Sequence, residues 1–462
     1  MRLRLAFSAA ALAACSHPHE LADASPPIDG HMIDGGTRSV VTEIPLALDR
    51  NLDLLFVIDN SGSMKEEQQN LVANFPKLVN VLSSIPGGLP DVHIGVVSSN
   101  LGVGNWAFQQ CPVGGDAGHL LQGPDGTHCA SLDPNAKFIS DVASGQTRTK
   151  NYTGALEDTF SCMAQLGTSG CGLESHLESM KVALDPATTF NAGFLRPEAY
   201  LGVVFVGDED DCSASDVSVF DPSDTTKGGI NFRCTEYGVT CDGDQDPLHM
   251  QTEGDRTNCA PREDSTYLYH VDRYIGFLRG LKTDPSHVVV ADIGGPSKPV
   301  SIGPDTYENM PTVPALQASC QSTGGYAFPA VRRAAVVNAF GVRGSTSSIC
   351  NPDLSDAMTV IAQQMKSALG DPCITGTVDD VDPSTPGLQA DCEVTQIAGT
   401  TETPLAQCLP DGPGAHSNTP CWYLDVDALQ CASTPDHLKL VFDYTGTTPP
   451  ANARLRLSCV AH

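Results

Sequence analysis

Seventeen cysteines constrain this 462-residue chain more than any other feature of its sequence. The cytosol keeps thiols reduced, and the chain lacks the paired C-x-x-C motifs of thiolate metal sites. We therefore expect an exported protein with disulfides. Apart from Cys15, an even number of cysteines remains, which can close as eight pairs: Cys111, Cys129, Cys162, Cys171, Cys212, Cys234, Cys241, Cys259, Cys320, Cys350, Cys373, Cys392, Cys408, Cys421, Cys431 and Cys459.

The N-terminus indicates a route of export. Arg2 and Arg4 precede a short apolar segment that ends in Leu12-Ala13-Ala14-Cys15. This ending resembles a bacterial lipobox, which implies lipidation at Cys15, removal of the signal segment, and anchoring to the envelope of a Gram-negative bacterium, at the outer membrane. An ordinary export signal is the alternative. We assign residues 1–15 to the signal segment with its lipobox cysteine, and 16–50, rich in Pro, Gly and Asp, to a flexible tether.

Residues 51–370 alternate between strand and helix patterns. Apolar runs typical of buried parallel strands lie at 54–58, 92–97, 201–206 and 287–293. Helical periodicities lie at 71–82, where Pro76 would kink or divide the helix, and at 173–184, 268–278 and 354–369. The alternation predicts an α/β fold with a doubly wound, mainly parallel sheet flanked by helices, interrupted by insertions at about 100–150 and 209–264.

The chain changes character at about residue 371. From there to residue 462 it has short β-like runs, Pro/Gly turns and six of the cysteines. We expect a small, disulfide-rich, mostly β module at 371–462.

The candidate metal-binding motif of the chain is Asp59-Asn60-Ser61-Gly62-Ser63. It follows the first apolar run directly, at the carboxyl end of a strand, where ligand sites form in open α/β sheets. Two hydroxyls beside a carboxylate are hard oxygen ligands, which suit Mg²⁺, Mn²⁺ or Ca²⁺ rather than zinc.

This D-x-S-x-S pattern resembles the first strand end of the von Willebrand factor type A (vWA) family. The resemblance covers about residues 52–369 and implies a metal-ion-dependent adhesion site (MIDAS). By resemblance, Asp59, Ser61, Ser63, Thr168 and Asp208 would hold Mg²⁺ or Mn²⁺, with Ca²⁺ as an alternative. One coordination position would stay open for an acidic side chain of a protein partner. Ser169 is an alternative to Thr168, and a vestigial metal site is the alternative to a working one.

Further acidic residues and one cysteine pair give secondary expectations. A second cation could bind the three acids after Asp208, which are Glu209, Asp210 and Asp211, or the acids Asp242, Asp244, Asp246 and Glu253, although solvated acidic loops are the alternative. The spacing from Asp242 is that of a calcium loop, but Pro247 stands where an EF-hand needs Gly. Cys162 and Cys171 are predicted to form a local disulfide beside the metal loop.

Charge and motifs limit the function. Against 26 Lys+Arg stand 55 Asp+Glu, and the net charge of −29 argues against nucleic-acid binding. No motif of a known nucleophile elbow, zinc protease or nucleotide loop occurs, so we expect no enzyme. The sequence therefore predicts an envelope lipoprotein that binds a protein through a divalent cation and touches the membrane through its lipid alone. A metal-independent envelope scaffold and a secreted hydrolase with catalytic groups in the insertions are the alternatives.

Overall fold

The computed structural model describes most of the chain from residue 38 onward. The described residues are 38–46, 48–106, 108, 111–244, 246–305, 310–322, 325–385, 388–411, 415–432, 434–450 and 453–461. Cys15 and the signal segment lie outside these residues, so lipidation stays a prediction.

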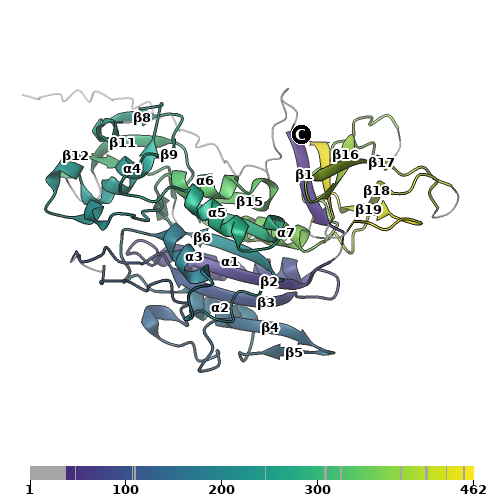
Figure 1. Ribbon diagram of the computed structural model, residues 1–462, viewed down its shortest axis with the longest axis horizontal. Coiled ribbons are helices and arrows are strands. Elements are labelled where there is room, and N and C mark those ends of the chain that lie inside the picture. Colours follow the sequence, from purple (N-terminus) through teal and green to yellow (C-terminus); the bar gives the residue numbers. More distant parts are fainter. Residues whose placement is uncertain are drawn as a thin grey trace, which may run out of the picture.

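A seven-stranded sheet forms the middle of the molecule (Figure 1). Its strand order is β15-β10-β6-β2-β3-β4-β5. The strands are β2 (Asn51–Ile58), β3 (Asp91–Ser98), β4 (Ile139–Ser144), β5 (Thr147–Lys150), β6 (Tyr200–Val206), β10 (Val288–Gly294) and β15 (Gly344–Ser348). Neighbours from β15 to β3 pair in parallel, whereas β3–β4 and β4–β5 pair antiparallel, so the sheet is mixed. The expected insertion at 100–150 thus extends this sheet.

Helices cover both faces of the sheet, and each face has its own apolar core. One core involves α1 (Lys65–Ser83), α2 (Leu156–Ala164) and α7 (Ser355–Ala368); the other involves α3 (His176–Leu184), α5 (Asp272–Gly280) and α6 (Val331–Asn338). Alternate residues of β2 point into the two cores, Phe56 into the first and Val57 into the second. Pro76 lies inside α1, which runs on without a break.

A second sheet of six strands lies at one end of the molecule (Figure 1). Its order is β1-β20-β16-β17-β18-β19, from β1 (Arg38–Pro45), β16 (Cys392–Ala398), β17 (Thr401–Gln407), β18 (Cys421–Val426), β19 (Leu438–Asp443) and β20 (Arg454–Ala461). Strand β1 pairs antiparallel with β20 along its whole length. Residues 38–45 were expected in the flexible tether, and this assignment is wrong for them: the C-terminal module takes its edge strand from the N-terminal side of the chain.

The remaining elements are short. The acidic insertion contributes α4 (Arg233–Gly238), β7 (Val239–Thr240), β8 (Gly254–Arg256) and β9 (Ala260–Pro261). Strand β8 joins β11 (Val300–Asp305) and β12 (Met310–Leu316) in a three-stranded sheet, and β13 (Cys320–Ser322) pairs with β14 (Gly325–Ala327). No helix in the described part of the chain is long and apolar enough to cross a membrane.

The predicted class is wrong for this chain. The described residues hold twenty strands in five sheets against seven α-helices, and the two larger sheets mix parallel and antiparallel pairs. The chain is therefore mostly β with mixed sheets, not a doubly wound, mainly parallel α/β fold. The error has a physical cause. Fully buried strands show as continuous apolar runs, whereas exposed strands such as β17 and short ones such as β8 leave little pattern.

Eight disulfides use all sixteen cysteines in the described part of the chain. The pairs are Cys111–Cys171, Cys129–Cys162, Cys212–Cys234, Cys241–Cys259, Cys320–Cys350, Cys373–Cys431, Cys392–Cys459 and Cys408–Cys421. The expected disulfides are confirmed, but the Cys162–Cys171 pairing is wrong. Such a number of disulfides is typical of an extracellular or surface protein.

Candidate metal centre

The D-x-S-x-S segment forms a tight loop between β2 and α1. Asp59 Oδ1 accepts a hydrogen bond from the Ser61 backbone N–H at 2.7 Å, and Ser99 Oγ donates to the same oxygen at 3.4 Å. The hydroxyl oxygens of Ser61 and Ser63 lie 3.2 Å apart. Asp59 and Ser61 are buried, and Ser63 is half-buried. The loop thus gathers two hydroxyls and one carboxylate in a small space.

Asp208 joins this loop because β2 and β6 are parallel neighbours in register. Ile58 pairs with Val206, so the residues that follow both strands meet at one sheet edge. The Asp59 backbone N–H donates to the Val206 carbonyl at 2.8 Å. Asp59 Oδ2 and Asp208 Oδ1 are both buried without a hydrogen-bond partner. Buried carboxylate oxygens without a donor are costly unless a cation compensates them.

The loop that carries Thr168 is tied to the same segment by backbone and side-chain bonds. The Gln68 amide donates to the carbonyls of Asp59 and Gly167, each at 2.9 Å. The Gly170 backbone N–H donates to the Asn60 carbonyl at 2.8 Å. A Cβ at Gly170 would lie 2.0 Å from Asn60 Oδ1, so the two loops touch where only glycine fits. The structure therefore brings the loop of Thr168 beside the serine motif.

Two further acids belong to this centre: Glu174, which the sequence analysis missed, and Glu209, which it considered only for a second cation. Glu174 precedes α3, and Glu209 follows Asp208. One carboxylate oxygen each from Asp59, Glu174 and Glu209 lie within 4.8 Å of one another. Glu174 is 3% exposed, and its Oε1 has no hydrogen-bond partner. Neither acid lies in a spacing motif with Asp59, so only the folded chain shows that they lie beside it.

Burial dominates the electrostatics of the centre. It raises the pKa of Asp59 and of Glu174 well above their usual range, and the charges of neighbouring acids raise both further. Burial also raises the pKa of Glu209 to about 7, with Asp208 adding to the effect. For Asp208, burial raises the pKa against the hydrogen bond from Ser63, which lowers it. Without a metal cation, these raised pKa values favour the protonated, neutral form of the carboxyl groups.

Arg333 lies close to the centre and partly compensates the negative charge of its carboxylates. Arg333 is buried in α6 and donates to the Gly207 carbonyl at 2.9 Å. Its guanidinium also pairs with buried Asp292 at 3.1 Å, so its charge is shared with another acid. Arg333 therefore leaves much of the negative charge of the centre uncompensated.

Two acids that were candidates for an extra cation have protein partners instead. Asp210 accepts hydrogen bonds from the backbone N–H groups of Arg332 and Arg333, at 2.8 and 3.2 Å, and so caps α6. Asp211 accepts from the backbone N–H of Leu177 at 2.9 Å and pairs with the buried Arg332 guanidinium at 3.1 Å. Both side chains hold helices in place, and neither belongs to the group of acids that could share an ion among the described residues.

The acids of the loop from Asp242, which has the spacing of a calcium loop, also form hydrogen bonds within the protein. Asp242 accepts from the backbone N–H of Thr257 at 3.1 Å and from its hydroxyl. Asp244 accepts from the Asp246 backbone N–H at 2.8 Å and contacts the His249 ring. Among the described residues, Asp242, Asp244, Asp246 and Glu253 do not form a group able to share an ion. The structure does not bring these four together as a cation site.

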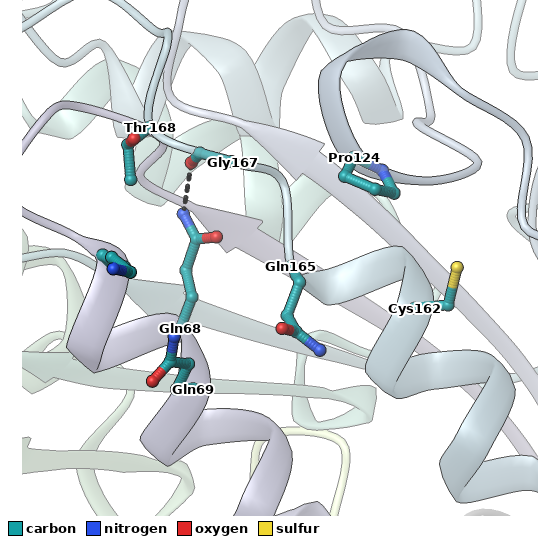
Figure 2. A pocket seen from close by; sticks show the side chains of 8 residues that line it. Gln68, Gln69, Pro124, Cys162, Gln165, Gly167 and Thr168 are labelled. Atoms are coloured by element: carbon teal, nitrogen blue, oxygen red, sulfur yellow. Dashed lines mark hydrogen bonds between the residues drawn. The ribbon is translucent and has the colours of Figure 1, made fainter.

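A pocket of ≈ 460 Å³ opens beside Thr168 (Figure 2). Gln68 and Gln69 come from α1, and Gln165 follows α2 on the opposite side. Lys65, at the start of α1, also lines the pocket and is exposed. The lining is therefore rich in amide groups and carries a positive charge, next to a strongly acidic centre.

No family model matches the chain, and no curated protein matches it. Among solved structures, it is similar to the pilus adhesin SpaC from Lactobacillus rhamnosus GG in an open conformation, at 9% identity over 93% of this chain and 43% of that one, with a TM-score of 0.31. It is also similar to the pilus adhesin RrgA from Streptococcus pneumoniae, at 9% identity over 91% of this chain and 58% of that one, with a TM-score of 0.28. The chain thus spans about half of their lengths. Likeness at this level assigns neither a family nor an activity.

Proposed function

We propose that this is an exported binding protein that captures an acidic protein partner through a divalent cation. The cation would be held by Asp59, Ser61, Ser63, Thr168 and Asp208. The observation that carries the proposal is the pair of buried carboxylate oxygens, Asp59 Oδ2 and Asp208 Oδ1, that lack any hydrogen-bond donor beside two clustered hydroxyls. Oxygen donors of this kind suit Mg²⁺ or Mn²⁺, with Ca²⁺ as the alternative.

The partner's carboxylate would complete the coordination of the cation. The centre is built from carboxylates, so the carboxylate of a partner can approach at low cost only where a cation lies between them. The exposed Lys65 and the amides of the neighbouring pocket would then receive polar or acidic side chains next to that carboxylate. The partner fitting this surface is a protein segment with an acidic residue and polar neighbours.

Anchoring to the envelope belongs to the same proposal. A lipid on Cys15 would hold the protein at a membrane. Intact mass of the membrane fraction tests this: a chain that begins at Cys15 with acyl chains attached supports it. An unmodified Cys15 in a soluble mature protein contradicts it.

The binding proposal is tested by partner capture from envelope extracts in Mg²⁺ and in chelator. We expect the Asp59→Ala variant and the chelator each to abolish capture of the same protein, with the fold checked by circular dichroism. Glu66→Gln, a change at an exposed acid one residue after Lys65, is the matched control and should capture normally. Unchanged capture with Asp59→Ala and with chelator would refute the metal bridge and favour a metal-independent scaffold.

A further inference from the structure

The acids Glu174 and Glu209 are not explained by the serine motif. Glu174 lies just before α3, and Glu209 lies just after β6. Neither acid is among the residues proposed to hold the cation that binds the partner. Glu174 is almost fully buried, and one of its carboxylate oxygens has no donor. Asp59 is fully buried, and its Oδ2 also has no hydrogen-bond donor. Two such carboxylates facing one space need a counter-charge.

We propose that Asp59, Glu174 and Glu209 hold a calcium ion, separate from the cation at the serine motif. Asp59 would bridge the two ions through Oδ2, which has no partner in the protein and also faces the serine motif, whereas its Oδ1 accepts the Ser61 N–H. One carboxylate oxygen would therefore contact both ions. The site uses residues from three segments: the end of β2, the approach to α3 and the end of β6.

The ligand set favours calcium. The three carboxylate oxygens lie within 4.8 Å of one another, so one ion can contact all three. Mg²⁺ usually keeps several waters and binds one or two carboxylates, whereas Ca²⁺ takes about six to eight oxygen ligands. Three carboxylates, each able to bind through two oxygens, also match the higher coordination number of Ca²⁺.

The backbone around these acids is fixed, which would keep the site preformed. The Cys212 backbone N–H donates to the Glu174 carbonyl at 2.6 Å, and the Ser175 N–H donates to the Ser99 carbonyl at 2.8 Å. The disulfide Cys212–Cys234 follows Glu209 by three residues and holds the start of the acidic insertion. The ion would in turn hold together three segments that otherwise repel one another.

Counting calcium ions per chain tests the inference. The full chain, with its disulfides intact, is freed of metal with chelator and titrated with Ca²⁺ alone by calorimetry, with native mass spectrometry to count the ions. We expect two ions in the unaltered protein and in Glu66→Gln. The variant with Glu174→Gln and Glu209→Gln should lose one ion, as should the variant with Ser61→Ala and Ser63→Ala.

The outcomes separate this inference from the proposed function. If the glutamine variant binds as many ions as the unaltered protein, the second site is wrong. A single ion that both double variants abolish would also refute it, since one shared ion would explain the acids. If the glutamine variant loses one ion while the serine variant loses none and still captures the partner, the calcium site stands and the proposed function fails. Circular dichroism in chelator checks that each variant is folded.

Discussion

Replacing Asp208 and replacing Asp211, two acids in the segment after β6, should have different effects on the free energy of unfolding. This difference tests whether Asp208 belongs to a metal centre. Asp211 is fully buried, pairs with fully buried Arg332 at 3.1 Å, and accepts a hydrogen bond from the Leu177 N–H at the start of α3. Asp208 is equally buried but has an oxygen without a partner and faces other acids. We compare Asp211→Ala with Asp208→Asn.

Asp211→Ala leaves the buried Arg332 guanidinium without its carboxylate, with the carbonyls of Gly238 and Tyr269 as its remaining acceptors. Breaking a buried ion pair by removing one partner costs about 3–5 kcal/mol in the free energy of unfolding. At roughly 2 °C per kcal/mol for a domain of this size, the melting temperature should fall by about 6–10 °C. Asp208→Asn in chelator removes one charge from a repelling group, so the free energy of unfolding should stay unchanged or rise.

Thermal and denaturant unfolding followed by circular dichroism provide the measurement, with and without a divalent cation. With the cation present, Asp208→Asn should lose much of the stabilisation that the cation gives the unaltered protein. A loss below about 1 kcal/mol for Asp211→Ala would contradict the buried ion pair. Equal losses for the two variants in chelator would show that Asp208 is a structural acid, and the metal centre would lose its main support.

Other predictions concern the disulfides, the loop contact and the insertion. Thiol titration of the denatured, unreduced protein beginning after Cys15 should find almost no free thiol, because all sixteen cysteines are paired; several free thiols would contradict the pairing. Gly170→Ala forces a Cβ against Asn60 and should cost about 1–3 kcal/mol. It should also weaken cation binding roughly tenfold or more in calorimetry, whereas Gly172→Ala, which meets nothing closer than 3.9 Å, should not; equal affinities would refute the loop contact. Burial raises the pKa of Glu236 in α4 to about 7. A folded pKa above the unfolded one makes stability fall as the pH rises from about 4.5 to about 7. Glu236→Gln should lessen that fall in denaturant midpoints between pH 5 and pH 8, and an unaltered pH profile would show that Glu236 is not the group responsible.

The sequence by itself determined the local features of this protein. The buried strands β2, β3, β6 and β10 appear as apolar runs, because a strand covered on both faces packs most of its side chains into apolar cores. The even number of cysteines after Cys15 predicted complete pairing, which the structure confirms. The position of Asp59 directly after β2 also followed from the sequence, since a polar turn must end a buried run.

Tertiary structure alone decided the class of the chain and the roles of its acids. Strand β1 pairs with β20 from the far end of the sequence, a contact that no local pattern can encode. Asp208, Asp210 and Asp211 look alike in sequence, yet Asp210 caps a helix, Asp211 neutralises an arginine, and Asp208 keeps an oxygen without a donor. A carboxylate's role depends on which donors and charges surround it. Those neighbours come from segments that meet only when the chain has folded.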